Sequence, residues 1–159
     1  MHNAEYSPTK PRYGERRISD KEYDELRKHT PSRKIRQKVN ENNVIGADAP
    51  AIPGKKIEGS LEADHIVSMD KIAKMENFDN LSTENQIKVL NYEENFTGLS
   101  KSSNTSKGAK SYSEWTTYKK ENIPISMEYK AEMMKKESAL EPVLQGMIDG
   151  LLKEQGVKS

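Results

Sequence analysis

Apolar residues recur along this chain at helical spacing in several short stretches and leave only brief candidates for β-strands. Ser19 and Glu22 have the spacing of a capping box, in which each side chain bonds to the backbone of the other. A short helix is therefore predicted from this point to about Lys28. Its buried side would carry Tyr23 and Leu26, which are three residues apart.

A second helix is predicted directly afterwards. Thr30 is a favourable N-cap residue, and Pro31 suits the first helical position, where no backbone N–H is needed. The helix would carry Arg33, Lys34 and Arg36 and few apolar residues. It is therefore expected to lie on another part of the protein and not to form a core.

A turn followed by a strand is predicted in the middle of the chain. The Pro-Gly pair at 53–54 suits a type II turn, because glycine accepts the positive φ at the third position. The strand would run through Val67, with Glu62 and Asp64 on one face and His65 on the other. Asp64 and His65 can face the same ligand only if the strand ends or bulges there.

Two further helical regions are predicted from periodicity. Residues 68–92 have apolar residues near helical spacing, and Thr83 and Gln86 fit a second capping box. Residues 126–153 have a heptad-like apolar stripe, which predicts a long helix or a helix pair. Pro142 lies inside this stripe and is expected to break or kink it.

A short strand and a helix are predicted between these two regions. The strand covers residues 95–99, and the helix begins near Asn104, capped by Ser102 or Ser103. Its buried side would carry Ala109, Tyr112, Trp115 and Thr116. Gly108 would fall inside this helix, where glycine costs up to about 1 kcal/mol relative to alanine. Its presence there suggests close backbone packing or the approach of a ligand.

Composition narrows the class of protein. The chain has 159 residues, 33% hydrophobic and 32% charged, which predicts one domain, or one domain with an arm, and a modest core. No apolar run approaches the roughly 20 residues of a membrane span. Cysteine is absent, which excludes disulfides, thiol catalysis and cysteine-ligated zinc. A bound metal would have to use His, Asp, Glu or Asn.

Charge is unevenly distributed, although the net charge is +1. Lys and Arg outnumber Asp and Glu by 5 in residues 1–40 and by 4 in residues 101–120. Asp and Glu outnumber Lys and Arg by 6 in residues 41–100 and by 2 in residues 121–159. Basic segments beside an acidic one suit a phosphate-backbone substrate. Ordinary solvated surface is the commoner explanation of such a pattern when charge is the only observation.

Asp64, His65 and Asn104 have the chemistry of a metal-assisted phosphodiesterase. A carboxylate and an amide carbonyl are oxygen ligands suited to a hard divalent cation. The imidazole of histidine ordinarily titrates near neutrality, so it can accept a proton from water. Taken alone, the Asp-His pair is weak evidence, because a histidine on an apolar strand is more often a hydrogen-bonded core residue.

The complete pattern resembles the HNH, or ββα-metal, endonucleases, which include endonuclease VII-like resolvases and nuclease colicins. It consists of a strand with Asp64-His65, a strand with Asn95, and a helix with Asn104 and Lys107. The resemblance implies that His65 is the general base and that Asp64 and Asn104 ligate one metal ion. It also implies that Asn95 fixes the loop of His65. The ion would be Mg²⁺, with Mn²⁺, Ni²⁺ and Zn²⁺ as alternatives.

Further side chains are candidates for a supporting role. Glu62 shares the predicted face of Asp64 and could be an outer-shell or second ligand, or simply a charge that pairs with a neighbouring strand. Basic side chains around the motif could contact phosphate or remain solvated. They are Lys101, Lys107, Lys110, Arg33, Lys34 and Arg36.

Three longer segments, 62–69, 89–96 and 106–115, resemble the C-terminal nuclease modules of bacterial polymorphic toxins. This resemblance implies a DNase with little sequence preference, delivered by a larger secreted toxin into the cytoplasm of a target cell. It implies a cognate immunity protein and no membrane partner, and it leaves RNA open as a substrate. The alternatives are a phage or restriction-type HNH enzyme and a nucleic-acid-binding module without catalytic activity.

The predicted fold class is α+β and mainly α-helical. A ββα-metal core, formed by a short β-hairpin and a helix that binds one metal, would be surrounded by additional helices. Residues 1–45 would form a basic arm with short helices, and residues 46–120 the nuclease core with a helical insertion at 68–92. Residues 121–159 would form a C-terminal helical extension that packs on the core.

Overall fold

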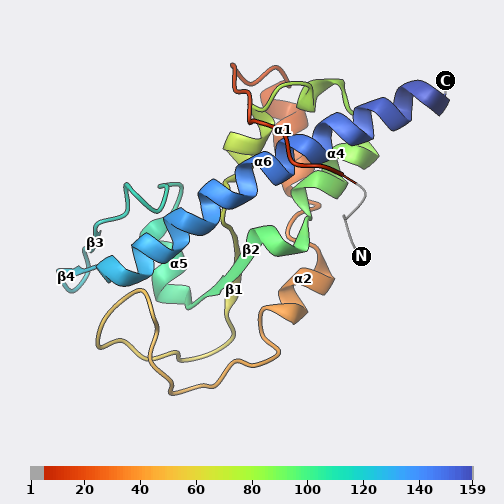
Figure 1. Cartoon of the computed structure of the whole chain (residues 1–159). Helices are drawn as coiled ribbons and strands as arrows, with labels where there is room; N and C mark the ends of the chain where they lie inside the picture. Colours follow the sequence, from red (N-terminus) through yellow and green to blue (C-terminus); the bar gives the residue numbers. More distant parts are fainter. Residues whose placement is uncertain (1–5, 159) are drawn as a thin grey trace. The chain divides into compact units, whose positions relative to one another are not determined.

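The computed structural model describes residues 6–158 and is mainly helical, with two small antiparallel sheets (Figure 1). The predicted mixed and mostly helical class is thereby confirmed. In the described range the α-helices are α1 (Asp20–Arg27), α2 (Arg33–Lys38), α3 (Met69–Ala73), α4 (Thr83–Leu90), α5 (Lys101–Lys107) and α6 (Met127–Lys158). Two 3₁₀ turns, η2 (Phe78–Asn80) and η3 (Glu93–Asn95), precede α4 and β2. The strands are β1 (Glu62–His65), β2 (Phe96–Leu99), β3 (Thr117–Tyr118) and β4 (Ile123–Pro124).

The chain divides into two compact units, each made of segments that are distant in sequence. Unit 1 comprises Met1–Ser32, Val67–Asn95 and Ser138–Ser159, and unit 2 comprises Arg33–Ile66 and Phe96–Glu137. The predicted insertion at 68–92 falls within unit 1, whereas β1, β2 and α5 all belong to unit 2. None of the helices in the described range is both long enough and apolar enough to span a membrane.

The core of unit 1 is formed by α1, α3, α4 and the C-terminal part of α6. The predicted capping box of α1 is confirmed, since Glu22 N donates to Ser19 Oγ and Ser19 N donates to Glu22 Oε1. The N-cap of α4 is Ser82 and not the predicted Thr83. The buried apolar residues include Tyr23, Leu26, Ile72, Phe78, Val89, Leu90, Leu144, Ile148 and Leu151.

Of the two predicted effects of Pro142, a break or a kink, the break does not occur, because α6 continues from Met127 to Lys158. The turns that follow Pro142 are held by burial, since Leu144, Met147 and Ile148 all lie in the core of unit 1. Tertiary packing of these side chains outweighs the hydrogen bond that proline cannot donate.

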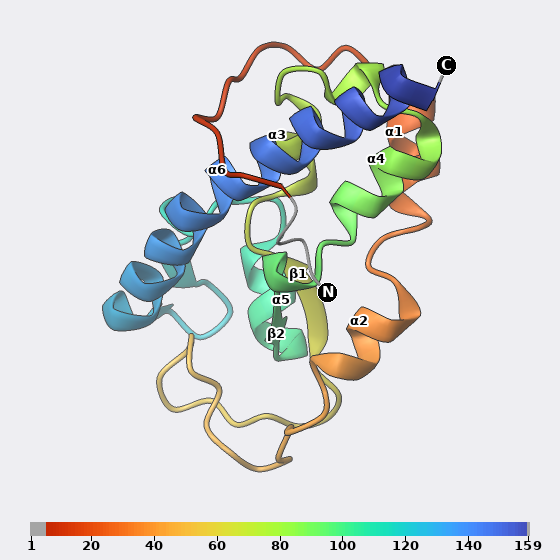
Figure 2. The same ribbon diagram turned by 45° about the vertical axis from the view of Figure 1, so that its right-hand side comes forward.

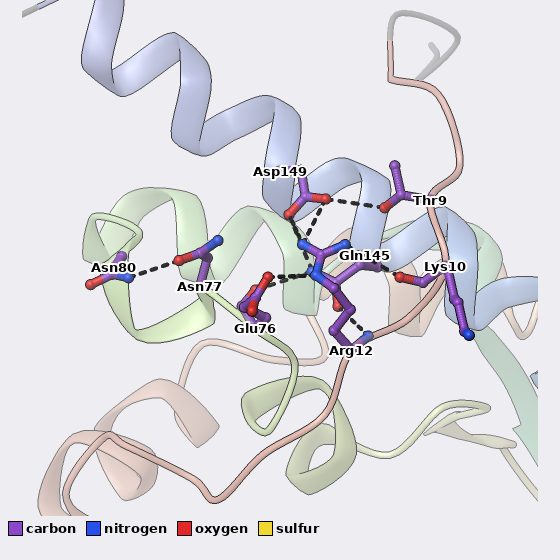
Figure 3. Close-up of polar contacts among 8 residues, drawn as sticks. All are labelled: Thr9, Lys10, Arg12, Glu76, Asn77, Asn80, Gln145 and Asp149. Atoms are coloured by element: carbon purple, nitrogen blue, oxygen red, sulfur yellow. Dashed lines mark hydrogen bonds and ion pairs between the residues drawn. The ribbon is translucent and has the colours of Figure 1, made fainter.

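Residues 6–18 are irregular in structure, but they are bound to unit 1 at several points. Figure 3 shows the Arg12 side chain between the carboxylates of Glu76 and Asp149. The Arg12 backbone N–H donates to Oε1 of Gln145, which is fully buried in α6 (2.9 Å). Thr9 Oγ1 donates to Asp149 Oδ2 (3.1 Å). Residues 6–18 of the predicted basic arm are therefore a component of unit 1.

Gly146→Ala is expected to detach this arm from α6. A Cβ added at Gly146 would lie 2.0 Å from the carbonyl oxygen of Ser7, so the backbone of the arm would have to move. Overpacking of this kind costs about 1–3 kcal/mol, more than the helix propensity of up to about 1 kcal/mol gained from alanine. Urea unfolding should show the loss. Gly156→Ala is the matched control, because nothing lies within 4 Å of its added Cβ. Equal stability of the two variants would contradict the prediction.

The structural centre of unit 2 is an antiparallel pair of strands followed at once by a helix. β1 and β2 lie side by side with α5 next to them (Figures 1 and 2). The N-cap of α5 is Ser100, whose hydroxyl accepts from Ser103 N, so the helix begins three residues before Asn104. This corrects the predicted caps. Gly108 ends α5 with a φ of 54° and does not lie inside it. Glycine tolerates this left-handed conformation without a Cβ clash.

The remainder of unit 2 packs around this hairpin and helix. α2 begins at Arg33 and not at Pro31, and the Thr30 hydroxyl donates to Leu90 O instead of capping the helix. Residues 111–116, predicted to extend the helix of Asn104, are non-helical, but Tyr112 and Trp115 are fully buried. Their rings are drawn into the core by burial of apolar area, which does not require helical backbone.

Candidate active site

Glu62, Asp64 and Asn104 are gathered on one side of β1. The register of β1 with β2 is regular from Glu62 to His65, so Glu62 and Asp64 share a face. Asn104, on α5, donates from Nδ2 to Glu62 Oε1 at 2.6 Å. All three side chains are half-buried. Two carboxylates and one amide therefore meet where α5 packs against β1.

Asp64 is engaged by two further residues of unit 2. Its Oδ2 atom lies 3.2 Å from Lys107 Nζ and accepts a 2.9 Å hydrogen bond from the Tyr112 hydroxyl. Lys107 is only 4% exposed, and its ammonium lies 4.6 Å from the centre of the Tyr112 ring. Lys107 therefore neutralises Asp64 within the fold, and its contact with phosphate stays a prediction.

Two tyrosines form the inner wall beside Asp64. Burial, and then the negative charge of Asp64, strongly raises the pKa of Tyr112, so this hydroxyl remains a proton donor to the carboxylate. Tyr129 of α6 contacts Tyr112 edge-on, with 6.2 Å between ring centres. Burial raises the pKa of Tyr129 to about 12. Sequence patterns did not single out either tyrosine, because their spacing matched ordinary core residues.

His65 is the last residue of β1. It pairs in register with Phe96, and the two rings lie 4.3 Å apart, tilted by 45°. Because the register stays regular to this point, strand alternation places His65 on the face opposite Asp64. β1 ends at His65 without a bulge in the pair. The strand therefore ends only after His65, and the imidazole lies against Phe96, away from the Asp64 face.

Asn95 holds the backbone of Val67, within unit 1. Asn95 is fully buried; its Oδ1 accepts from Val67 N (2.8 Å), and its Nδ2 donates to Val67 O (3.0 Å). Val67 follows His65 by two residues, and Asn95 directly precedes β2. One amide thus satisfies both backbone groups of a buried residue just after the candidate base.

Asn40 makes a second bracket of the same kind, within unit 2, that sequence reasoning missed. Its Oδ1 accepts from Leu61 N (2.7 Å), and its Nδ2 donates to Leu61 O (3.0 Å). Leu61 directly precedes β1, whereas Val67 follows it. Asparagine amides therefore hold the chain just before and just after β1. No local pattern marks Asn40, because its partner lies 21 residues away.

The other basic residues predicted to contact phosphate are exposed in unit 2. Lys101 begins α5, and Lys110 follows its end. Arg33, Lys34 and Arg36 lie on α2, whose buried residue is Ile35. These positions are compatible with contacts to a phosphate backbone.

The donor set fits a hard divalent cation in chemical type. Carboxylate and amide oxygens are the ligands that Mg²⁺ takes from proteins. Glu62 holds Nδ2 of Asn104, which leaves the amide oxygen as the ligating atom, and Asp64 retains acceptor capacity beyond the two contacts on Oδ2. Within residues 6–158 no group of three or more His, Cys, Asp and Glu side chains is arranged to hold a metal. A site here would therefore depend on the Asn104 amide and on water.

No family model, no curated protein and no solved structure matches this chain.

Proposed function

We propose that the protein is a metal-dependent endonuclease of the HNH type that hydrolyses DNA phosphodiester bonds with little sequence preference. The observation that carries the proposal is the meeting of β1 and α5. There Asp64 and Asn104 lie on two adjoining elements, and Glu62 bonds to the Asn104 amide at 2.6 Å. The candidate base, His65, is the residue after Asp64.

The proposed roles follow from the chemistry of each side chain. Asp64 and Asn104 would hold the cation, and Glu62 would orient the Asn104 amide as an outer-shell partner. A bound divalent cation stabilises the negative charge that develops on the phosphorane and on the leaving oxygen. His65 would accept the proton of the attacking water.

The surrounding residues would keep this arrangement ordered. Lys107 and Tyr112 share Oδ2 of Asp64 and so restrict the carboxylate to one orientation. Asn95 would fix the chain after His65 through its two bonds to Val67, which makes it a positioning residue. Supporting bonds of this kind matter because small displacements of catalytic groups reduce rates strongly.

Supercoiled plasmid incubated with the protein is expected to be nicked or degraded with Mg²⁺ and to stay intact with EDTA. Asp64→Asn should lose both cleavage and Mg²⁺ binding measured by titration calorimetry, because the amide replaces the charged ligand at nearly constant shape. Asp48→Asn is the matched control, since Asp48 is exposed and pairs with Lys56 in the same unit.

Two results would count against this proposal. Wild-type Mg²⁺ affinity in Asp64→Asn would refute the ligand assignment. A folded protein that binds DNA but cuts neither DNA nor RNA with any divalent ion would favour the non-catalytic nucleic-acid-binding module. Cleavage of RNA alone would keep the mechanism and change the substrate.

For the biological setting, the proposal is the toxic domain of an antibacterial polymorphic toxin, neutralised by a cognate immunity protein. The support is the resemblance of segments 62–69, 89–96 and 106–115 to such modules. Among these residues lie the proposed ligand Asp64, the base His65 and the positioning residue Asn95. The phage or restriction-type setting would use the same chemistry.

A further inference from the structure

A basic cleft lies on the side of α5 away from β1. Its lining includes four lysines from three segments of unit 2, namely Lys101 of α5, Lys110 after it, and Lys119 and Lys120 of the β3–β4 hairpin. One carboxylate, Glu58, also lines it. The sequence had suggested a phosphate role for Lys101 and Lys110. Lys119 and Lys120 were not predicted, because only the fold brings them to the same cleft.

Among residues 6–158, the four ammonium groups of the basic cleft form no ion pair. Within the described part of the chain none of them lies within 4 Å of a carboxylate, although other lysines of unit 2 do form ion pairs. Lys55 pairs with Glu121, Lys56 with Asp48 and Lys107 with Asp64. The pKa of Glu114 is lowered mainly by hydrogen bonds with Ser111 and further by the charge of Lys110.

Hydroxyl groups line the same wall between these charges. Ser102 and Thr105 lie on the face of α5 that carries Lys101 and borders the cleft. Lysine and hydroxyl side chains are the usual donors to phosphate oxygens in nucleic-acid complexes. The aromatic lining residue, Tyr118, is only 6% exposed, with the Lys55 ammonium over its ring, so it offers little surface for base stacking. The cleft therefore fits a phosphodiester backbone better than it fits bases.

A second hollow joins the basic cleft to the candidate active site. It is lined by Glu62 and by the N-cap residue Ser100, and it shares Glu58, Lys101 and Ser102 with the cleft. A strand could therefore pass from Glu62 around the start of α5 to the lysines. The diameter of an α-helix with its side chains is about 10 Å, so the two positions would hold different phosphates of one substrate.

We propose that the basic cleft binds the backbone of a nucleic-acid strand away from the scissile phosphate, with Lys119 and Lys120 on one wall and Lys101 and Lys110 on the other. This inference rests on the proposed function for its substrate class. Because its contacts would all be to phosphate and none to base edges, it accounts for cleavage without sequence preference.

The test is binding of a fluorescein-labelled DNA oligonucleotide, single-stranded and duplex, measured by anisotropy in EDTA so that no cleavage occurs. Lys119→Ala/Lys120→Ala should reduce the slope of log K against log salt by about 2, or about 1 per lysine. Affinity should fall about 10- to 100-fold at about 0.1 M salt. The loss should be the same for different sequences.

The matched control is Lys135→Ala/Lys136→Ala, which removes an adjacent, exposed lysine pair from α6 in the same unit. An equal loss of DNA affinity in both double variants would indicate diffuse electrostatic attraction and would overturn the proposed binding at the cleft. Unchanged affinity in the hairpin variant would overturn it as well. Adding Lys101→Ala and Lys110→Ala to the hairpin variant should lower the slope further, and an unchanged slope would remove the second wall from the site.

The cleavage assay with plasmid and Mg²⁺ separates this inference from the proposed function. Cleavage by the wild type together with unaltered DNA binding by the hairpin variant would refute binding at the cleft and support the proposed nuclease activity. Binding through the cleft by a protein that never cuts would support the cleft and refute the nuclease. Absence of binding by the wild type would overturn the cleft, whatever the cleavage result.

Discussion

His65→Ala is expected to reduce Mg²⁺-dependent plasmid cleavage by about 10²- to 10⁴-fold, the usual contribution of a general base. The variant removes the imidazole from the end of β1 without touching Asp64, Asn104 or Glu62. Magnesium affinity, measured by calorimetry, should therefore stay near the wild-type value. A loss of cleavage with retained metal binding would assign His65 to the chemical step and not to the metal site.

The imidazole must reach the attacking water from its place beside Phe96, with 4.3 Å between ring centres. Truncation to alanine also removes this ring contact, so thermal unfolding has to be followed in parallel. His29→Ala is the matched histidine control, because the His29 side chain is 52% exposed at the end of α1. It should leave cleavage unchanged. Wild-type cleavage by His65→Ala would show that another residue is the base.

Asn95→Ala is expected to lower the free energy of unfolding by about 2–6 kcal/mol, because it leaves the Val67 N–H and C=O buried without partners at about 1–3 kcal/mol each. Val67 and Asn95 are both fully buried, so water cannot easily replace the amide. Such a loss is a large part of the 5–15 kcal/mol typical of a domain. Urea unfolding followed by circular dichroism measures it.

Asn91→Ala provides the control for this prediction within the same unit. Asn91 also makes two bonds to backbone, from Nδ2 to His29 O (2.8 Å) and from Ser32 N to Oδ1 (3.1 Å), but it is only half-buried. Water can take over these bonds, so the expected loss is about 1 kcal/mol or less. Equal losses in the two variants would show that burial does not decide the contribution of Asn95.

Asn95→Asp tests the positioning role of Asn95 with a side chain of nearly the same size and shape. Aspartate can still accept from Val67 N, but it cannot donate to Val67 O. If Asn95 positions the chain after His65, this variant should lose cleavage rate while its Mg²⁺ affinity stays unchanged. A parallel fall in both would place Asn95 in the support of the whole fold.

Local sequence signals were good guides where the structure depends on neighbouring residues. The Ser19–Glu22 capping box, the burial of Tyr23 and Leu26, and the short strands around Asp64 and after Asn95 all occur as predicted in kind. Helix starts were less reliable where several serines or threonines compete. Ser82 and Ser100 cap α4 and α5, although neighbouring residues had the same capping chemistry.

The predicted break at Pro142 does not occur, for a related reason. Proline disfavours a helix interior by a local effect, whereas α6 is stabilised by packing against residues that are distant in sequence. Leu144, Ile148 and Leu151 are buried with α1 and α4 residues more than fifty positions away in sequence. Periodicity correctly indicated which face of α6 would be buried. Only the packed core shows that this burial outweighs the unfavourable effect of Pro142 on the helix.

By itself the sequence determined the chemical types available to the site, since Asp64, His65, Asn95 and Asn104 are the oxygen ligands, base and amide that the proposed reaction requires. Only the tertiary structure decided which atoms meet. Tyr112 reaches Asp64 across 48 residues, and Asn104 reaches Glu62 across 42. The fold buries Lys107 against Asp64, and within residues 6–158 it places no carboxylate within 4 Å of the four lysines of the basic cleft. The physical reason is that burial and long-range hydrogen bonds depend on how strands and helices pack, and residue spacing does not encode that packing.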